Sequence, residues 1–134
     1  MSNSEIAIDW SLYPNFQAKE FVCSHSGECY MHPQFLEVLQ RIRSMYGEAM
    51  IISSGYRSIA HPEEVNKLHP GEHTLGLAAD ILCSGTNAIR LLQSALKCGI
   101  RRIGINQKGL HKSRYLHCGI ADQFGLMPPA LWTY

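Results

Sequence analysis

Apolar residues recur with helical spacing in two stretches of the chain. Residues 33–46 open with a proline, carry apolar residues at intervals of three and four, and are followed by Gly47. A second amphipathic stretch runs from a cap at Thr86 or Asn87 to Gly99. The pattern predicts two helices, each with one face turned towards a core.

Short apolar runs predict four strands, at residues 49–53, 75–83, 100–105 and 115–120. A short helix is expected over 62–68 and a loop over 106–114. Residues 1–20 are expected to form an irregular lead-in, and residues 121–134 a packed irregular tail. Helices and strands mix without regular alternation, so the expected fold class is α+β: one domain of 134 residues with a small antiparallel sheet flanked by helices.

Charge is distributed unevenly along the chain. Residues 1–80 contain ten acidic and five basic residues, whereas residues 90–114 contain seven basic residues and no acidic one. Such a run can favour an anionic polymer such as nucleic acid or cell wall, or it can be the solvated surface of a helix and its loops. We expect no nucleic-acid partner, and the net charge of +1 does not alter this expectation.

The chain has five scattered cysteines, an odd number that cannot all pair within one chain. This usage suits a reducing compartment, where thiols serve as small core residues. The stretch from Met1 to Trp10 has no basic residue and no apolar segment of signal-peptide length. No apolar run approaches the roughly 20 residues of a membrane span. We therefore expect a protein that is cytoplasmic as synthesised, monomeric and without a membrane partner.

Two residues of the segment 71–81 are candidate metal ligands. Asp80 lies in an apolar strand-like run, where a carboxylate is costly unless it is paired or bound to a metal. His73 precedes it by seven residues and follows a Pro-Gly turn, so both side chains can converge on one cation. The alternative is that Asp80 forms a buried salt bridge, for example with Arg57, while His73 lies on a surface loop.

A third ligand must come from another segment, and His117 in the strand-like run 114–120 is the candidate. The alternative is that His117 is a hydrogen-bonded core residue, which is the commoner role of a single histidine in a strand. The neighbouring Cys118 is expected to face the core, because adjacent strand residues point to opposite faces. A different register would turn Cys118 towards the metal and make the site a closed, structural one.

These residues together resemble the zinc D-Ala-D-Ala carboxypeptidase family. The resemblance rests on Ser-Ser-Gly-Tyr-Arg-Ser at 53–58, on His73 with Asp80 seven positions later, and on the strand histidine His117. That family includes L-alanyl-D-glutamate endolysins of phages, and its fold is shared by the hedgehog signalling domain. The similarity covers about residues 16 to 120 and implies a Zn²⁺ ion held by His73, Asp80 and His117.

The resemblance also implies a role for Arg57, the counterpart of an arginine that holds a carboxylate of the peptide substrate. A guanidinium recognises a carboxylate through two parallel hydrogen bonds, although Arg57 can instead be a structural partner of Asp80. Family members carry a general-base carboxylate three residues before the third ligand or an acid two residues after it. This chain has Arg114 and Gly119 at these positions.

The nearest acids that could replace the missing base are Glu72 and Asp122. A second cluster of metal-compatible residues, namely Cys23, His25, Cys29 and His32, lacks a close Cys-x-x-Cys pair and is expected to be a turn with buried thiols or a disulfide.

The resemblance implies a zinc peptidase that hydrolyses peptidoglycan stem peptides, as a carboxypeptidase or endolysin, released at lysis or carried on a phage particle. The alternative is a zinc-containing module that binds a wall peptide or a protein partner without turnover.

Overall fold

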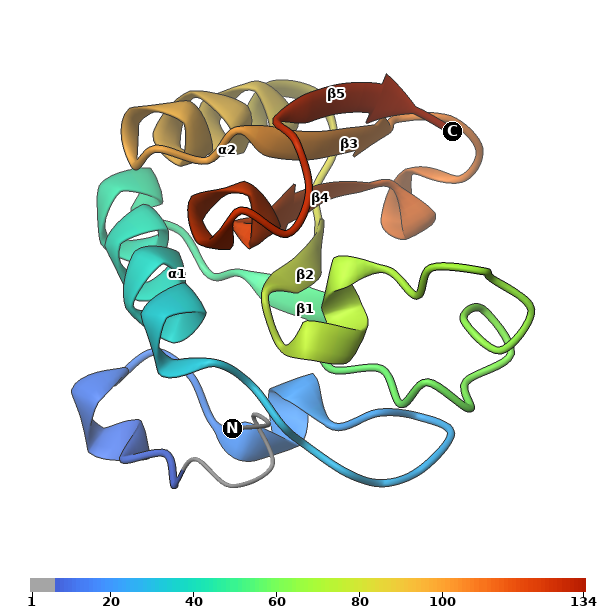
Figure 1. The fold of residues 1–134 in the computed structure, drawn as a ribbon. Coiled ribbons are helices and arrows are strands. Elements are labelled where there is room, and N and C mark those ends of the chain that lie inside the picture. Colours follow the sequence, from blue (N-terminus) through green and yellow to red (C-terminus); the bar gives the residue numbers. More distant parts are fainter. Residues whose placement is uncertain (1–6) are drawn as a thin grey trace.

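The computed structural model describes residues 7–134, and its regular elements follow the expected mixed order (Figure 1). The helices are α1 (Pro33–Tyr46) and α2 (Gly85–Lys97). The strands are β1 (Ile51–Ser54), β2 (Ala78–Leu82), β3 (Arg102–Asn106), β4 (Tyr115–Gly119) and β5 (Ala130–Thr133). Short 3-10 helices lie between them, namely η2 (Trp10–Leu12), η3 (Ala18–Phe21), η4 (Glu72–Leu75), η5 (His111–Ser113) and η6 (Ala121–Phe124).

The strands form one sheet in the order β1-β2-β4-β3-β5. Neighbouring strands are antiparallel except for β3 and β5, which run parallel. This arrangement confirms the predicted α+β class and its mostly antiparallel sheet. The strands β2, β4 and β3 have neighbours on both sides, and the adjacent pair β2 and β4 carries two of the three candidate metal ligands.

Both long helices begin and end at identifiable caps. The His32 side chain accepts a hydrogen bond from the Gln34 amide at the start of α1, and Gly47 ends the helix in the left-handed conformation at φ 75°. Helix α2 begins at Gly85 after Ser84, so the cap expected at Thr86 or Asn87 was placed too late. The carbonyl of Ser84 already accepts a bond from Ala88, which puts both expected caps inside the first turn.

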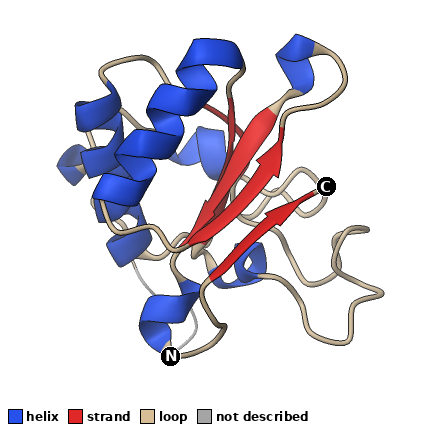
Figure 2. Cartoon of the chain, turned by 90° about the horizontal axis from the view of Figure 1, so that it is seen from above, coloured by secondary structure: helices blue, strands red, loops and turns tan. Residues whose placement is uncertain are grey.

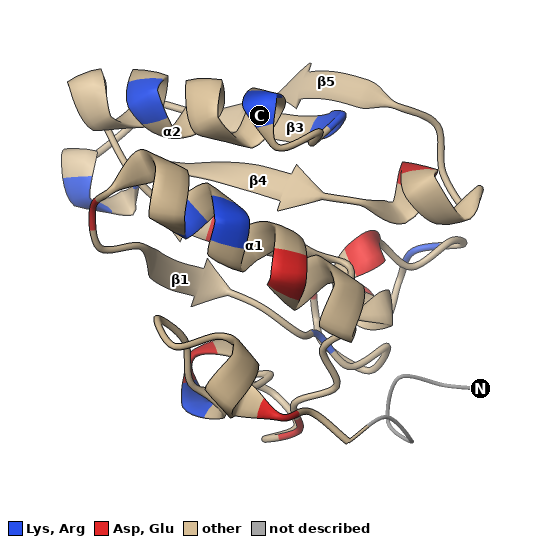
Figure 3. Cartoon of the chain, turned by 90° about the vertical axis from the view of Figure 1, so that its left-hand side faces the viewer, with Lys and Arg blue, Asp and Glu red and all other residues tan. Residues whose placement is uncertain are grey.

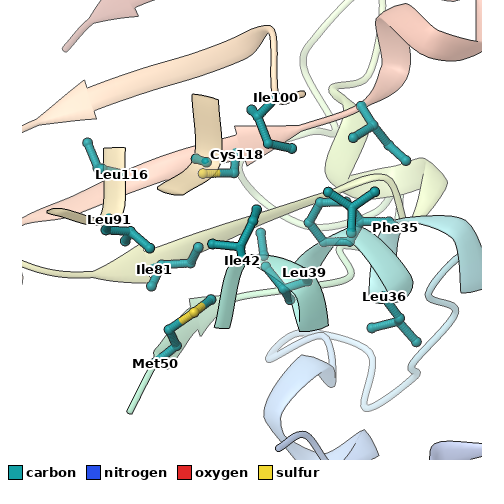
Figure 4. Close-up of a cluster of buried hydrophobic side chains, with 14 of the residues drawn as sticks. Phe35, Leu36, Leu39, Ile42, Met50, Ile81, Leu91, Ile100, Leu116 and Cys118 are labelled. Atoms are coloured by element: carbon teal, nitrogen blue, oxygen red, sulfur yellow. The ribbon is translucent and has the colours of Figure 1, made fainter. Parts of the chain in front are cut away.

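The two helices pack side by side on one face of the sheet, where the apolar core lies (Figure 2). Leu39 and Ile42 of α1 and Leu91 of α2 are fully buried there. They meet Ile81 and Cys118 from the central strands, as the close-up of the core shows (Figure 4). Cys118 therefore lies in the core, as its strand position predicted.

Three local predictions need correction. The tail predicted to be irregular contains β5, because Ala130 donates a backbone bond to Arg101 directly after the two prolines and starts the pairing with β3. Residues 62–68 form turns instead of a helix, since the buried Glu64 carboxylate accepts a bond from the Gly71 amide and folds the segment back. The predicted strand 75–83 is shorter, because Leu75 ends the 3-10 helix η4.

The lead-in predicted for residues 1–20 contains the short helices η2 and η3, while its first six residues lie outside the described part of the chain. The cysteines at positions 23, 29, 83, 98 and 118 are all free thiols. Within residues 7–134, no helix has the length and apolarity needed to cross a bilayer.

Basic and acidic residues are interspersed on the helical side of the molecule, and α1 carries both signs (Figure 3). Several members of the basic segment 90–114 are engaged by other groups of the protein. Arg90 pairs with Glu48, and Arg102 pairs with Glu72. Arg114 donates to the Gly109 carbonyl in its own loop. The segment is therefore no continuous patch of uncommitted charge.

Candidate metal centre

One row of paired residues runs across the sheet and forms the floor of the site. Ser54, Asp80, His117, Gly104 and Trp132 are partners in register on the five strands, in sheet order. Paired residues on adjacent strands point to the same face. This face is opposite the one that carries the core residues of β2 and β4, so a polar row can exist beside an apolar core.

His73 reaches the row from outside the sheet. It lies on η4, which ends at Gly76 in the left-handed conformation (φ 70°) before the chain enters β2. Its Nδ1 is 2.8 Å from the carbonyl oxygen of Gly55, so Nδ1 carries the proton and Nε2 faces Asp80. A Cβ on Gly55 would lie 2.7 Å from the Cα of Phe21, so the close packing that places this carbonyl requires glycine.

His73, Asp80 and His117 converge as potential ligands of one ion. All three are buried, and one donor atom from each lies within 4.8 Å of the others. Asp80 Oδ1 is 3.4 Å from His73 Nε2 and 3.1 Å from His117 Nδ1. Two imidazoles and one carboxylate are the donors of a catalytic zinc site with an open fourth position. Within residues 7–134, no other group of three or more such side chains has converging donors.

The charges of the three residues depend on each other. Burial alone raises the pKa of Asp80, but hydrogen bonds with His117 and His73 outweigh it and hold this pKa well below its usual range. Burial alone lowers the pKa of His117, whereas its bonds with Asp80 and Glu72 outweigh burial and raise this pKa. Both ring nitrogens of His117 face carboxylate oxygens, which favours its charged form, and a cation that binds here would take the place of a proton.

Glu72 binds the far edge of the His117 ring. Its Oε2 is 2.8 Å from His117 Nε2 and 2.8 Å from Arg102 Nε, and its Oε1 accepts from the Ala121 amide. The side chain is 2% exposed. Burial raises the pKa of Glu72, but the bonds with His117 and Arg102 outweigh it and lower the pKa. The sequence analysis named Glu72 as a candidate base. In the structure its carboxylate binds Nε2 of His117, so the imidazole ring of His117 lies between this carboxylate and Nδ1, the nitrogen that faces Asp80.

Arg57 lies at the rim of the site with its guanidinium turned towards the protein. It donates to Ser54 Oγ at 3.1 Å and to Glu64 Oε2 at 3.0 Å, and its contact with Asp80 Oδ2 is longer, at 3.5 Å. Glu64 is buried, and Lys67 and the Gly71 amide complete its partners. The structural pairing of Arg57 with Asp80 is present, and Arg57 also lines the cleft above the three ligands.

A cleft of about 320 Å³ opens above the three ligands. Its walls include Arg57, Lys67, Arg102 and the aromatic residues Tyr115, Trp132 and Tyr134. Trp132 lies 5.0 Å from the His117 ring, centroid to centroid. A Cβ on Gly104 would lie 2.5 Å from Trp132 Nε1, so glycine at this position leaves room for the indole.

Sequence reasoning missed two residues of the site: Trp132, which forms part of the cleft wall, and Glu64, which pairs with Arg57 at the rim. The signal for Trp132 was Gly104 inside a strand, which indicates a close approach by another group. No signal of comparable strength marked Glu64, since a glutamate in a charged loop is usually solvated.

The remaining sequence candidates are not among the residues that line the cleft. Asp122 is on η6 and does not line the cleft, and its Oδ1 is a buried atom without a hydrogen-bond partner in the described structure. Arg114 points to its own loop. The candidate second cluster (Cys23, His25, Cys29 and His32) does not bring three donors together, although the His25 ring lies 6.1 Å from that of His61.

Two comparisons with known proteins bear on the family of this chain. A search of curated proteins gave no significant match to this chain. A family model described as Peptidase M15 matches residues 14–119, which is most of the chain and includes the three candidate ligands. This match confirms the family that the sequence motifs resembled. A buried His-Asp-His centre at the floor of a cleft is the site that a metallopeptidase needs. The chain belongs to the peptidase M15 family of metallopeptidases.

Proposed function

We propose that the chain is a zinc peptidase that hydrolyses peptidoglycan stem peptides. The observation that carries the proposal is the convergence of His73, Asp80 and His117 beneath a cleft in a peptidase M15 chain. Three cationic side chains line this cleft, namely Arg57, Lys67 and Arg102. The same cleft is lined by four acidic residues (Glu63, Glu64, Glu72 and Asp80), so it attracts the free carboxylates of wall peptides once a divalent cation is bound there.

The residues of the chain contribute positioning and charge. A zinc ion, when bound, activates water and polarises a carbonyl as a Lewis acid. His73 and His117 are held in fixed orientations by Gly55 O and Glu72, which preserves the geometry of the three donors. Arg57 offers its guanidinium to a substrate carboxylate, and Trp132 closes one side of the cleft.

A non-catalytic zinc module that binds a wall peptide is the second candidate. The binding module is favoured by the acids that line the cleft. The carboxylates of Glu64, Glu72 and Asp80 all have partners within the protein, so none of them is free to act as the general base. Glu63 also lines the cleft and is exposed, but the sequence gives no reason to place it over the metal. General-base catalysis contributes about 10²–10⁴-fold to such reactions, so its absence leaves binding with little turnover.

The two candidates differ in one experiment, a digest of purified peptidoglycan with zinc-loaded protein read by mass spectrometry. The peptidase releases stem-peptide fragments that identify the bond cleaved. The His73→Ala variant and a chelated sample serve as controls, and both should release none. Zinc-loaded protein that releases no fragment from several wall chemotypes, yet sediments with the wall, would refute the peptidase and support the module.

A further inference from the structure

Position 119 has no side chain, and a carboxylate from another segment fills its space. An ideal Cβ built on Gly119 would lie 2.5 Å from Glu72 Oε2 and still closer to the other carboxylate atoms. Gly119 lies on β4 and Glu72 on η4, two segments that are far apart in the sequence. Any side chain at 119 and the observed Glu72 side chain therefore exclude each other.

Gly119 is two residues after His117 on the same strand, so both face the site. The Glu72 carboxylate lies between them, 2.8 Å from His117 Nε2. Aspartate oxygens are two bonds beyond Cβ, which is about the separation between the ideal Cβ of residue 119 and Glu72 Oε2. An aspartate at 119 can therefore bring its carboxylate to the same edge of the imidazole ring.

The contacts of this carboxylate determine which nitrogen of His117 is free. Glu72 accepts from Nε2 and so holds Nδ1 towards Asp80 and His73, where a metal ion that binds would take the place of the Nδ1 proton. Arg102 binds the same oxygen from the other side and fixes the position of the carboxylate. We propose that Glu72 is the positioning residue of His117, and that its carboxylate replaces one that a side chain at position 119 would supply.

The proposal predicts that the carboxylate can be moved between the two positions. Glu72→Ala should weaken zinc binding by about 10–100-fold, the usual effect of removing a group that orients a ligand. Gly119→Asp alone should weaken it as well, because its Cβ overlaps Glu72. The double variant Glu72→Ala/Gly119→Asp should recover most of the affinity, to within a few-fold of the unsubstituted protein.

The measurement is the zinc dissociation constant, obtained by competition with a chromophoric chelator on the full chain. The visible absorption of the Co²⁺-loaded protein reports whether the ligand geometry is restored. Glu37→Ala, an exposed glutamate of α1, is the matched control and should bind zinc normally. Circular dichroism of each metal-free variant separates loss of the fold from loss of the ligand orientation.

A purely structural Glu72–Arg102 ion pair makes a different prediction. In that case Arg102→Ala would weaken zinc binding as much as Glu72→Ala, and Gly119→Asp would rescue neither. Unchanged affinity in Glu72→Ala, or no recovery in the double variant, would overturn the proposal. If Glu72→Ala does not fold, Glu72→Gln is used in its place, because it keeps the side-chain volume and removes the charge. This variant should still bind zinc measurably more weakly. Normal zinc affinity would refute the role of Glu72 as the positioning residue of His117.

The inference rests on the metal site of the proposed function, and the two can fail separately. An unsubstituted protein that does not bind zinc would refute the metal site itself. A protein that binds zinc equally well with and without the Glu72 carboxylate would refute only the positioning role.

Discussion

Asp80 and Ile81 are neighbours on β2, yet they belong to opposite faces of one sheet. Ile81 is fully buried against α1 and α2, in the apolar core. Asp80 is also buried, but among two histidines and an arginine. The core face is stabilised by burial of apolar area, which depends little on direction. The site face depends on hydrogen bonds between charged groups, which require particular atoms at particular distances.

The difference suggests that stability and function are separable by face. Substitutions on the core face should lower the free energy of unfolding and preserve the ligand set. Substitutions of the metal ligands on the site face should abolish metal binding by the folded protein. Four substitutions follow, ordered from the largest expected effect to the smallest: the first two test this separation, and the last two measure what a buried and an exposed ion pair contribute to stability.

Asp80→Ala should abolish stoichiometric zinc binding. Loss of a direct ligand should reduce zinc affinity by more than the roughly 10–100-fold produced by loss of an orienting group. Metal analysis of gel-filtered protein, with circular dichroism of the same sample, measures the effect. Asp122→Asn is the matched control, because Asp122 lies outside the cleft, and it should hold one zinc per chain. Zinc retained in Asp80→Ala would contradict the assignment of the site.

Ile81→Ala should lower the free energy of unfolding by about 2–5 kcal/mol, because it leaves a cavity at a fully buried position. The folded protein should still bind zinc in the same ratio, since the side chain points away from the ligands. Urea unfolding of the metal-free protein gives the first quantity, and metal analysis gives the second. Normal stability with lost zinc would show that the faces are not separable.

Glu64→Gln should cost about 1–3 kcal/mol at neutral pH, because Arg57, Lys67 and the Gly71 amide lose a charged acceptor. Burial raises the pKa of Glu64, but the bonds from Gly71, Arg57 and Lys67 outweigh it and lower the pKa. The folded carboxyl thus binds its proton less readily than the unfolded one. This stabilisation is present above the ordinary glutamate pKa and is lost as pH falls through the lowered value.

Urea unfolding of both forms between pH 7 and pH 3 tests this pH dependence. The difference between them should shrink towards acid, where the native carboxyl becomes neutral like the amide. A difference that stays constant over this range would show that the charge of Glu64 contributes nothing.

Glu48→Ala should have the smallest effect, within about 0.5 kcal/mol. Glu48 pairs with Arg90 at 3.2 Å, but about half of its side chain is exposed, and exposed pairs contribute little. Arg90 also keeps its bond to the Tyr46 carbonyl. Thermal unfolding at low and at 1 M salt measures the contribution. A loss above 1 kcal/mol would mean that this helix contact is more important than its exposure indicates.

Periodicity predicted the core face well, because apolar spacing directly reflects which side of an element is buried. Residues 33–46 met their predicted bounds for this reason, and Cys118 was correctly placed in the core. The strand β5 was missed because two prolines precede a four-residue run, and its pairing with β3 is non-local. Only the assembled sheet shows that Trp132 lies beside His117.

On the site face, the sequence predicted only those residues whose type and spacing match a known pattern of metal ligands. His73, Asp80 and His117 were found by combining residue type, spacing and resemblance to a family, and the structure brings them together. The sequence could not show that the Glu72 carboxylate occupies the space that a side chain at position 119 would fill. A glycine in a strand has several explanations, and the carboxylate that fills its space comes from a distant segment.

The position of Trp132 beside His117 gives the protein an intrinsic optical probe. The other tryptophan, Trp10, stacks on Phe21 in the N-terminal part of the chain and belongs to a different environment. Co²⁺ bound by the three ligands should quench the emission of Trp132 and leave that of Trp10 largely unchanged. In a Trp10→Phe background, fluorescence alone would then follow arrival of the ion, with no substrate and no added dye.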